Sequence, residues 1–369
     1  MSAKRRHLGA ANDSKPGADA RPVKRVTAAN VAEHADVSVA TVSLVVNRKT
    51  KNRVTPETEA RVLDAVKRLG YKVDGLARSL STGRRPYVPL ISPDLTNPFF
   101  SEVTMGIVET LGDAYQLFLV VSSLESETVR SQLEEVLALR PSGIIVDSPS
   151  RQLLREIDAE CPLVLLDAPD VPARDGRINL DLRHGAEALA DHLAELGHRR
   201  IAYLDAATGT STFQRRRGYL IDRLRSHGVV TIEALTSEPS LEDATRAFLE
   251  ELPRLKQSEC TALVTATDIQ AYGVLRAARL ERLAVPGDLA LASFDDLPYS
   301  ALMTPSLTTV HFPAREAGRA AAKALRHVME DDEGGPVNHL LPTSLVVRAS
   351  TTGLEDTSSH VYSKWRRSN

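Results

Sequence analysis

Hydrophobic and polar residues follow two different rhythms along the 369-residue chain. Between residues 27 and 70, apolar side chains recur every three or four positions, which is the spacing of one face of a helix. A serine or threonine suited to cap a helix precedes each of three such stretches. The predicted helices begin after the caps Thr27, Ser38 and Thr55 and end at Ala35, Asn47 and Leu69, with Pro56 opening the third and Gly70 stopping it. Only Asp36 and Val37 separate the first two, which predicts a helix-turn-helix.

From Tyr87 onward, short continuous apolar runs alternate with amphipathic stretches. Such runs are typical of strands that are buried on both faces, and intervening helices cover the faces of a parallel sheet. The predicted strands are VPLIS, LFLVVS, GIIVD, LVLLD, IAYLD, TALVT and LALASF. No G-x-G-x-x-G or Walker pattern follows any of them, so nucleotide chemistry has no support. The body is therefore predicted to be an α/β fold with parallel sheets and no cofactor.

The charge is divided unevenly, although the net charge is only −2. Residues 1–86 carry 18 Lys and Arg against 8 Asp and Glu, whereas the remaining 283 residues carry 28 against 40. A small basic end joined to a large acidic body indicates that the basic end meets a polyanion. A solvated basic tail is the alternative that charge alone leaves open.

Composition argues against several classes of protein. Cys161 and Cys260 fit no metal-ligand spacing, and two separate thiols are typical of a reduced, cytoplasmic compartment. No run of about 18 apolar residues occurs, so no membrane span is predicted. The basic N-terminus lacks an apolar segment and predicts a disordered arm rather than a secretory signal. No catalytic or metal-ligand constellation has usable spacing, and the C-terminal GLEDTSSHVYSKWRRSN has no leucine heptads that would predict a coiled-coil tetramer.

The second predicted helix, in ADVSVATVSLVVN, has two faces. Its core side is apolar and comprises Val42, Val45 and Val46. Val39, Ala40 and Ser43 fall on the other side. Thr41 and Ser43 are small enough for a phosphate backbone to approach, and a helix N-terminus favours anions. The pattern predicts a helix that packs with one face and recognises DNA with the other; a purely structural helix pair is the alternative.

Several motifs together resemble the LacI/GalR family of bacterial transcription regulators. TAANVAEHADVSVATVSLVVN, VTPET and LGYKVDGLARSL are similar to its DNA-binding headpiece and hinge helix. PDLTNPFF, LGHRRIAYL, RRRGY, TATDIQAYG and SFDD with PSLTTV follow in the family's order. The resemblance spans residues 25 to 352. It implies a three-helix headpiece and a hinge helix, followed by a two-lobed domain similar to periplasmic sugar-binding proteins.

The resemblance also implies which residues contact DNA. They are Thr27, Ser38, Val39, Ala40, Thr41, Ser43, Leu44, Asn47, Tyr71, Ala77, Arg78 and Leu80. Leu44 stands where many members carry arginine; leucine cannot bind guanine bidentately, although it can meet a thymine methyl. Leu80 in the hinge is an apolar wedge suited to a minor-groove step, with Arg78 near phosphate. Val73-Asp74 replaces the commoner Pro-Asn there, and a plain flexible linker is the alternative.

A small effector is expected between the lobes, at the carboxyl ends of the strands. The resemblance implies a cleft formed by Asp94, Asn97, Phe99, Asp147, Asp167, Arg215, Thr267, Asp295 and Phe312. Carboxylates, an amide and a guanidinium around an aromatic ring suit a hydroxyl-rich ligand such as a sugar. Thr267 replaces a frequent Asn and Phe312 a frequent Gln, so the motifs do not identify the sugar. For Arg215, a solvated basic helix face beside Arg216 and Arg217 is the alternative.

These observations predict a DNA-binding transcription regulator, a repressor that acts as a homodimer on a pseudo-palindromic operator and is controlled by a sugar-like effector. The expected location is the bacterial cytoplasm, on the nucleoid when bound. The predicted organisation is a basic arm (1–23), a helix-turn-helix domain (24–72), a hinge and linker (73–86), a two-lobed effector-binding and dimerisation domain (87–352) and a tail (353–369). A cytoplasmic sugar-binding receptor or a sugar-modifying enzyme with an accessory helical domain is the alternative.

Overall fold

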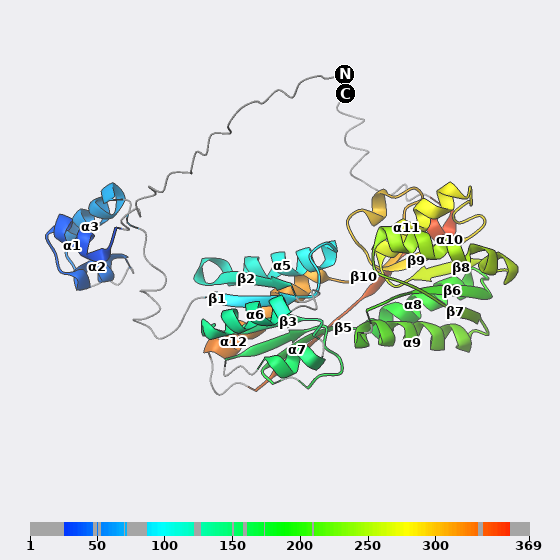
Figure 1. Cartoon of the computed structure of the whole chain (residues 1–369), viewed down its shortest axis with the longest axis horizontal. Helices are drawn as coiled ribbons and strands as arrows, with labels where there is room; N and C mark the ends of the chain where they lie inside the picture. The colour runs from blue at the N-terminus through cyan, green and yellow to red at the C-terminus, as the bar shows by residue number, and fades with distance from the viewer. Residues whose placement is uncertain are drawn as a thin grey trace, which may run out of the picture. The chain divides into compact units, whose positions relative to one another are not determined.

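The structure is a computed structural model of the whole chain (Figure 1). It describes residues 26–46, 50, 53–69, 71, 87–121, 127–149, 151–157, 161–172, 174–208, 210–330 and 335–354. The predictions for Asn47, Gly70, Ala77, Arg78, Leu80, the N-terminal arm, the hinge and nearly all of the tail therefore lie outside the described residues. The chain divides into two compact units, Met1–Ser81 and Thr82–Asn369.

The first unit contains the three helices expected from the sequence. They are α1 (Ala28–Ala35), α2 (Val39–Val46) and α3 (Pro56–Leu69). Thr27 caps α1 in a capping box with Asn30, and Asp36 ends that helix in the left-handed conformation at φ 51°. The helices enclose a small apolar core of Val31, Ala32, Ala35, Val42, Val45, Val62 and Ala65. The helix-turn-helix prediction is confirmed.

The first lobe of the second unit is built on a six-stranded sheet in the order β11-β5-β4-β3-β1-β2. Its strands are β1 (Tyr87–Ser92), β2 (Gln116–Val121), β3 (Ile144–Asp147), β4 (Leu163–Leu166), β5 (Gly176–Leu180) and β11 (Val337–Leu341). All neighbours in this sheet are parallel. Its helices are α5 (Pro98–Leu111), η1 (Gly112–Ala114), α6 (Glu127–Ala138), α7 (Arg151–Glu156) and α12 (Ala314–Glu330).

The second lobe repeats this architecture with the strand order β12-β10-β9-β8-β6-β7. Its strands are β6 (Arg200–Ala206), β7 (Val230–Ser237), β8 (Ala262–Thr265), β9 (Ala290–Asp295), β10 (Thr308–His311) and β12 (Ser344–Val346). Only β12 runs antiparallel within this sheet, against β10. Its helices are α8 (Leu182–Glu195), α9 (Ser211–Ser226), α10 (Leu241–Gln257), α11 (Asp268–Leu280), η2 (Ser300–Leu302) and α13 (Ala349–Thr352).

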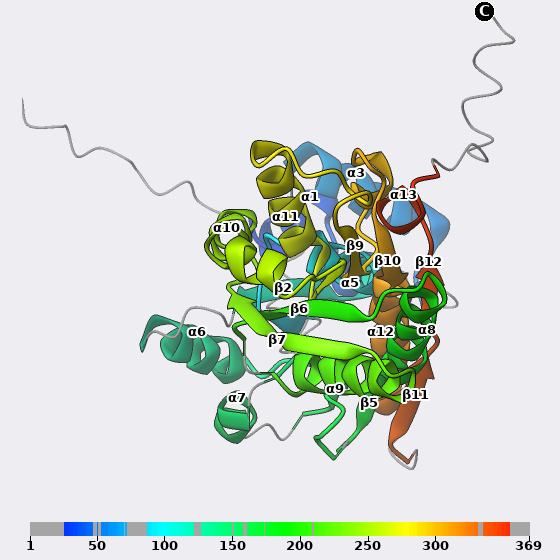
Figure 2. The same ribbon diagram turned by 90° about the vertical axis from the view of Figure 1, so that its right-hand side faces the viewer.

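Helices cover both faces of each sheet, as the near-continuous apolar strands require. Figure 2 shows α8 and α9 on one face of the second sheet and α10 and α11 on the other. In the first lobe, α5 and α12 pack closely against each other; Gly106 and Gly318 permit this, because a Cβ at either would meet the partner helix's backbone at 2.0 Å. Within the described part of the chain, connections 180–182, 311–314 and 341–344 carry the backbone between the lobes.

All seven predicted strands are present, as β1, β2, β3, β4, β6, β8 and β9. Five further strands, β5, β7, β10, β11 and β12, were not predicted from the sequence. In β5, buried and partly exposed positions alternate, while β7, β11 and β12 lie at or next to the sheet ends and carry polar side chains. The prediction of an α/β fold with two lobes and parallel sheets is confirmed.

Candidate functional site

The exposed face of α2 has the composition expected for contact with DNA. The N–H of Thr41 donates to the Ser38 hydroxyl at 3.1 Å, so Ser38 caps the helix. Ala40 and Ser43 are exposed, Val39 is 50% exposed, and α2 has no acidic residue in its first turn. The opposite side is buried at Val42 and Val45, with Val46 half-buried. One face of α2 is therefore core, and its other face offers small side chains beside a helix N-terminus.

The other headpiece residues differ in how much of their side chain is accessible. Thr27 is exposed, but its hydroxyl donates to Asn30 Oδ1 at 2.8 Å within the capping box. Thr41 and Leu44 are half-buried. Tyr71 packs on the headpiece core and its N–H donates to the Val66 carbonyl. Asn47, Ala77, Arg78 and Leu80 lie outside the described residues.

A cluster of acidic residues and one arginine lies where the two lobes meet. Asp147 ends β3 and Asp167 directly follows β4 in the first lobe, while Asp295 ends β9 in the second. Arg216, on α9, is 3.7 Å from Asp295 (Nη1 to Oδ1). The Ser148 hydroxyl donates to Asp147 Oδ1 at 3.0 Å and to Asp167 Oδ2 at 3.4 Å. We call Asp147, Asp167, Arg216 and Asp295 the cleft cluster.

Each member of the cleft cluster has a buried polar atom without a hydrogen-bond partner. These atoms are Asp147 Oδ2, Asp167 Oδ1, Arg216 Nε and Asp295 Oδ2. Unpaired buried polar groups are rare in folded proteins because each loses its hydration without compensation. Four such atoms at one junction, on residues from both lobes, indicate a candidate binding site for a polar ligand.

Burial also shifts the ionisation of these carboxyl groups. It raises the pKa of Asp147 from 3.8 to about 7, and the neighbouring charge of Asp167 adds to this effect. Burial raises the pKa of Asp167 despite the attraction of Arg216. It also raises the pKa of Asp295 well above 3.8, although Arg216 opposes that shift. The nearby Asp268 has its pKa raised to about 6 by burial, against hydrogen bonds from Ser300 and Thr309.

Aromatic rings close the cluster on its apolar side. The Arg216 guanidinium lies over the rings of Phe213, Phe294 and Phe312, at 4.8, 5.0 and 4.6 Å from their centroids. Phe312 is in turn 6.4 Å from Phe99, which belongs to α5 of the first lobe. Phe99 of the first lobe and Phe312 in the connection between the lobes, both predicted from the sequence, therefore lie near each other at the junction.

The structure brings some predicted cleft residues together and separates others. Asn97 caps α5 and its side chain contributes to lowering the pKa of Asp295, although burial and Asp268 outweigh it. Asp94 accepts hydrogen bonds from Thr96, next to it in the same loop. Thr267 is buried and caps α11. The side chains of Asp94 and Thr267 therefore form hydrogen bonds within their own loop or helix start.

Arg215 lies outside the cleft cluster. Its side chain is 42% exposed and pairs with Asp170, whereas the Arg216 side chain is only 5% exposed. The buried positions of α9 are Thr212, Arg216, Leu220 and Leu224, which recur every four residues. That helical spacing was readable in the sequence and would have selected Arg216 rather than its neighbour.

The sequence analysis also missed a charged network beside the cluster. Asp296 accepts from Arg348 Nη2 at 2.7 Å and lies 3.0 Å from His311 Nδ1. Burial opposes its ionisation, but the hydrogen bonds from His311 and Arg348 hold the pKa of Asp296 below its usual range. Asp295 and Asp296 both have positive φ, 117° and 55°, so the backbone turns and directs one carboxylate to Arg216 and the other to Arg348. The two neighbouring carboxylates therefore have separate partners and do not act as a pair.

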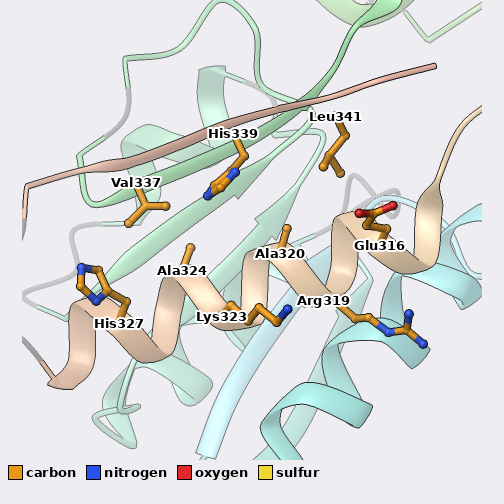
Figure 3. Close-up of a pocket in the computed structure, with 9 residues that line it drawn as sticks. All are labelled: Glu316, Arg319, Ala320, Lys323, Ala324, His327, Val337, His339 and Leu341. Carbon is orange, nitrogen blue, oxygen red and sulfur yellow. The ribbon is translucent and has the colours of Figure 1, made fainter.

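Two grooves open near these elements. One, of about 370 Å³, reaches Asp295 between the start of α5 and the start of α12 and includes Phe99, Phe312 and Arg315. The other, of about 760 Å³, lies between α12 and β11 (Figure 3). Its lining includes Lys323 and His339 and none of the residues predicted for the effector site. The smaller groove is thus the one that adjoins the cleft cluster.

Two other kinds of feature are absent from the described residues. No group of three or more His, Cys, Asp or Glu there is arranged to hold a metal ion. No helix in the described ranges is long and apolar enough to cross a membrane.

Comparison with known proteins identifies both parts of the chain. Residues 27–74 match the pattern of "Bacterial regulatory proteins, lacI family", and residues 190–351 match a "Periplasmic binding protein-like domain". The "HTH-type transcriptional repressor PurR" of Aliivibrio fischeri strain ES114 is 30% identical over 318 residues, which cover 83% of this chain and 93% of that protein. The chain belongs to the LacI family.

Other similar proteins align over nearly their whole length. The "Ribose operon repressor" of Halalkalibacterium halodurans is 29% identical over 337 residues, covering 89% of this chain and 98% of that one. The Lac repressor dimer bound to operator and the anti-inducer ONPF superposes with a TM-score of 0.78 at 26% identity, covering 89% and 99% of the two chains. The "transcriptional regulator CelR-cellobiose complex" superposes with a TM-score of 0.66 at 26% identity, covering 88% and 100%.

Membership in this family gives the function at the level of the class. The chain is a DNA-binding transcription regulator and not an enzyme. The alternative of a sugar-modifying enzyme or a receptor with an accessory helical domain is therefore set aside. Its headpiece corresponds to the DNA-binding domain of family members, and its two-lobed body corresponds to the domain that binds their ligands.

Proposed function

We propose that this regulator represses transcription as a homodimer and that a hydroxyl-rich small molecule in the cleft cluster controls its affinity for the operator. The observation that carries the proposal is the set of four unpartnered buried atoms on Asp147, Asp167, Arg216 and Asp295. The names of similar proteins agree with it, since one is a ribose operon repressor and another was solved with cellobiose.

The chemistry of the cluster suits a polyol. Each open carboxylate oxygen can accept a hydrogen bond from a ligand hydroxyl, and Arg216 Nε can donate one to a ligand oxygen. Hydrogen bonds that involve a charged partner are worth about 1.5–3 kcal/mol each. Phe99 and Phe312 supply apolar faces against which a sugar ring can pack. Recognition would therefore use both lobes at once.

A ligand held by both lobes couples binding to their arrangement. Asp147 and Asp167 belong to the first lobe, and Arg216 and Asp295 to the second. A ligand shifts a conformational equilibrium only by as much as its affinities for the two states differ. A ligand that bridges these four residues favours the arrangement of the lobes in which the residues lie close together. Residues 73–86 join the lobes to the headpiece, so the ligand would also alter how the two headpieces of a dimer are paired.

The homodimer is proposed to form through α5 and β2. Met105 and Val108 on α5 are both 44% exposed, and Phe118 and Leu119 on β2 are both 41% exposed. β2 is the end strand of the first sheet, so no further strand pairs with its outer side within the described chain, and these four apolar side chains stay partly exposed. A second copy would cover them, and the resulting two-fold symmetry matches a pseudo-palindromic operator.

DNA recognition is assigned to the exposed face of α2. Val39 and Ala40 would meet base edges in the major groove, with Thr41 and Ser43 near phosphates. The finer assignments of Asn47 and of the hinge residues Ala77, Arg78 and Leu80 rest on the resemblance alone. A regulator of this kind would work in the bacterial cytoplasm, on the nucleoid.

The test compares two neighbouring arginines. Fluorescence anisotropy gives the affinity of the full chain for labelled DNA from upstream of its own gene, with and without each of a panel of sugars. Arg216→Met should keep operator binding and lose the response to the active sugar. Arg215→Met, its surface control, should keep both, because Arg215 pairs with Asp170 outside the cluster.

Removing Arg216 leaves Asp295 buried without its partner, which can destabilise the fold. Asp295→Asn is therefore measured as a second variant, because it keeps the shape of the side chain and should also lose the response. A normal response in both cluster variants would refute the cleft assignment. Failure of the wild-type chain to bind any upstream DNA would instead count against the assignment of DNA recognition.

A further inference from the structure

The cleft cluster contains more acid than base. Three carboxyl groups of the cluster have open oxygens, whereas the cluster has a single guanidinium, that of Arg216, which pairs with Asp295. Arg216 also donates to the Ala266 carbonyl and lies over three phenylalanine rings, so much of its hydrogen-bonding capacity is already used. The surplus of acid is therefore a property of the site before any ligand enters.

A fourth carboxyl group increases this surplus. Asp268 is completely buried and accepts hydrogen bonds from Leu297 N and the Ser300 hydroxyl on Oδ2, and from the Thr309 hydroxyl on Oδ1. Its oxygens are thus satisfied, but its charge acts on Asp295 and raises the pKa of that residue, adding to the larger effect of burial. None of these bonds brings a cation to the cluster.

The surplus is greatest at Asp147 and Asp167. Ser148 bridges the two carboxylates, and no lysine, arginine or histidine among the described residues forms an ion pair with either. Arg216 acts on Asp167 from a distance and is paired with Asp295, on the other lobe. Asp147 is 2% exposed, so water does not screen its charge effectively. The described residues around it also form no metal-binding group.

We propose that the ligand of this cleft is a hydroxylated primary amine, an amino sugar or amino polyol, whose ammonium group binds between Asp147 and Asp167. The proposal rests on the proposed function of the cleft and narrows the class of its effector. Three ammonium hydrogens can donate to Asp147 Oδ2 and Asp167 Oδ1, while ligand hydroxyls reach Asp295 Oδ2 and a ligand oxygen accepts from Arg216 Nε. One molecule of this class pairs all four open atoms.

The same geometry disfavours phosphorylated and acidic sugars. A phosphate brings further negative charge beside three buried carboxyl groups, and within the cleft cluster only Arg216, already paired with Asp295, could offset that charge. A neutral sugar can donate hydrogen bonds to the open oxygens, but it brings no positive charge to stabilise the ionised forms of Asp147 and Asp167, whose pKa values burial raises. The charge of the amine therefore supplies the specificity, and the hydroxyl groups orient the ligand.

The experiment uses matched compounds that differ at one group. Isothermal titration of the full chain at neutral pH measures binding of D-glucosamine, D-galactosamine and D-mannosamine, of their parent hexoses, of the N-acetyl derivatives and of the hexose 6-phosphates. At least one amine should bind about tenfold or more tightly than its parent hexose and its N-acetyl derivative. The phosphates should bind more weakly than the parent hexoses.

Asp147→Asn tests where the amine binds. It should reduce the preference for amine over parent hexose to near unity, because the amide keeps an oxygen but loses the charge that the ammonium group pairs with. Asp170→Asn, which alters the exposed partner of Arg215, is the matched control and should keep the preference.

The outcomes separate this proposal from the function on which it rests. If a neutral hexose or a phosphate binds as tightly as its amine, or if none of the amines binds, the amine class is wrong. In that case an operator response to a neutral sugar that is lost in Arg216→Met still supports ligand control through the cleft. A response to some ligand that survives both Arg216→Met and Asp147→Asn would overturn the amine class and the cleft assignment together.

Discussion

Replacing Asp147 with asparagine should stabilise the ligand-free chain above neutral pH. Asp147 is fully buried beside Asp167, and one of its oxygens has no partner. An ionised carboxylate in such a place is destabilised, whereas an amide of the same shape carries no charge. The substitution should therefore raise the free energy of unfolding of the ligand-free chain and weaken ligand binding, a trade-off that is common at functional sites.

The size of the effect follows from the pKa of Asp147. Burial raises it from 3.8 to about 7, so the folded state holds the proton more tightly than the unfolded state. The stability that the protonated carboxyl contributes is complete below about pH 4 and is lost as pH rises through about 7. A shift of this size corresponds to at most about 4 kcal/mol. The net gain should be smaller, about 1–3 kcal/mol, because the amide nitrogen also needs a partner.

The assay is urea denaturation followed by far-ultraviolet circular dichroism at pH 5 and pH 8, for the wild-type chain, Asp147→Asn and Asp170→Asn. The free energy of unfolding of Asp147→Asn should exceed that of the wild type at pH 8, and the difference should shrink at pH 5. Asp170→Asn should show no such pH-dependent gain. The reasoning about buried charge would be refuted if Asp147→Asn were less stable than the wild type at pH 8. It would also be refuted if the free energy of unfolding of the variant differed from that of the wild type by the same amount at both pH values.

Two further predictions concern the surfaces. Met105→Asp places a charge on the exposed apolar face of α5, so it should convert the dimer to a monomer in analytical ultracentrifugation and weaken operator binding. Val230→Asp is the control, at an exposed apolar position on the end strand β7, and should do neither. Equal behaviour of the two variants would contradict the proposed dimer surface. Ser43→Glu should lower operator affinity, measured by fluorescence anisotropy, about tenfold or more, because the carboxylate repels phosphate. Ala60→Glu adds the same charge at an exposed position of α3 and should have a much smaller effect. Equal losses of affinity would show that α2 has no special role in DNA binding.

The sequence was most informative where one physical requirement dominates. Strands β3, β4 and β8 are buried at every position, so they appear as continuous apolar runs that are easily read. The caps Thr27, Ser38 and Thr55 each accept a backbone hydrogen bond at the predicted helix start. Strand β7 was missed because its polar residues at a sheet end give no comparable signal.

The cleft could be predicted only in part. Asp147, Asp167 and Asp295 were predicted from the family resemblance, and they stand at strand ends, where open α/β sheets bind ligands. Arg216 was not, because the prediction followed the family motif to Arg215 and did not use the four-residue spacing that places Arg216 with Thr212, Leu220 and Leu224 on the buried face. The pairing of Asp296 with Arg348 joins residues 52 positions apart in sequence, and its geometry depends on two consecutive residues with positive φ, which no local pattern announces.

The central claim is that the cleft and the DNA-binding headpiece share one conformational equilibrium. Titration of the effector into the free chain and into the operator-bound chain tests it most directly, because coupling between two binding sites is reciprocal. The account predicts that operator changes the effector's dissociation constant by the same factor by which effector changes the operator's, on the order of 5- to 150-fold. An effector that binds the free and the operator-bound chain with equal affinity would contradict the account.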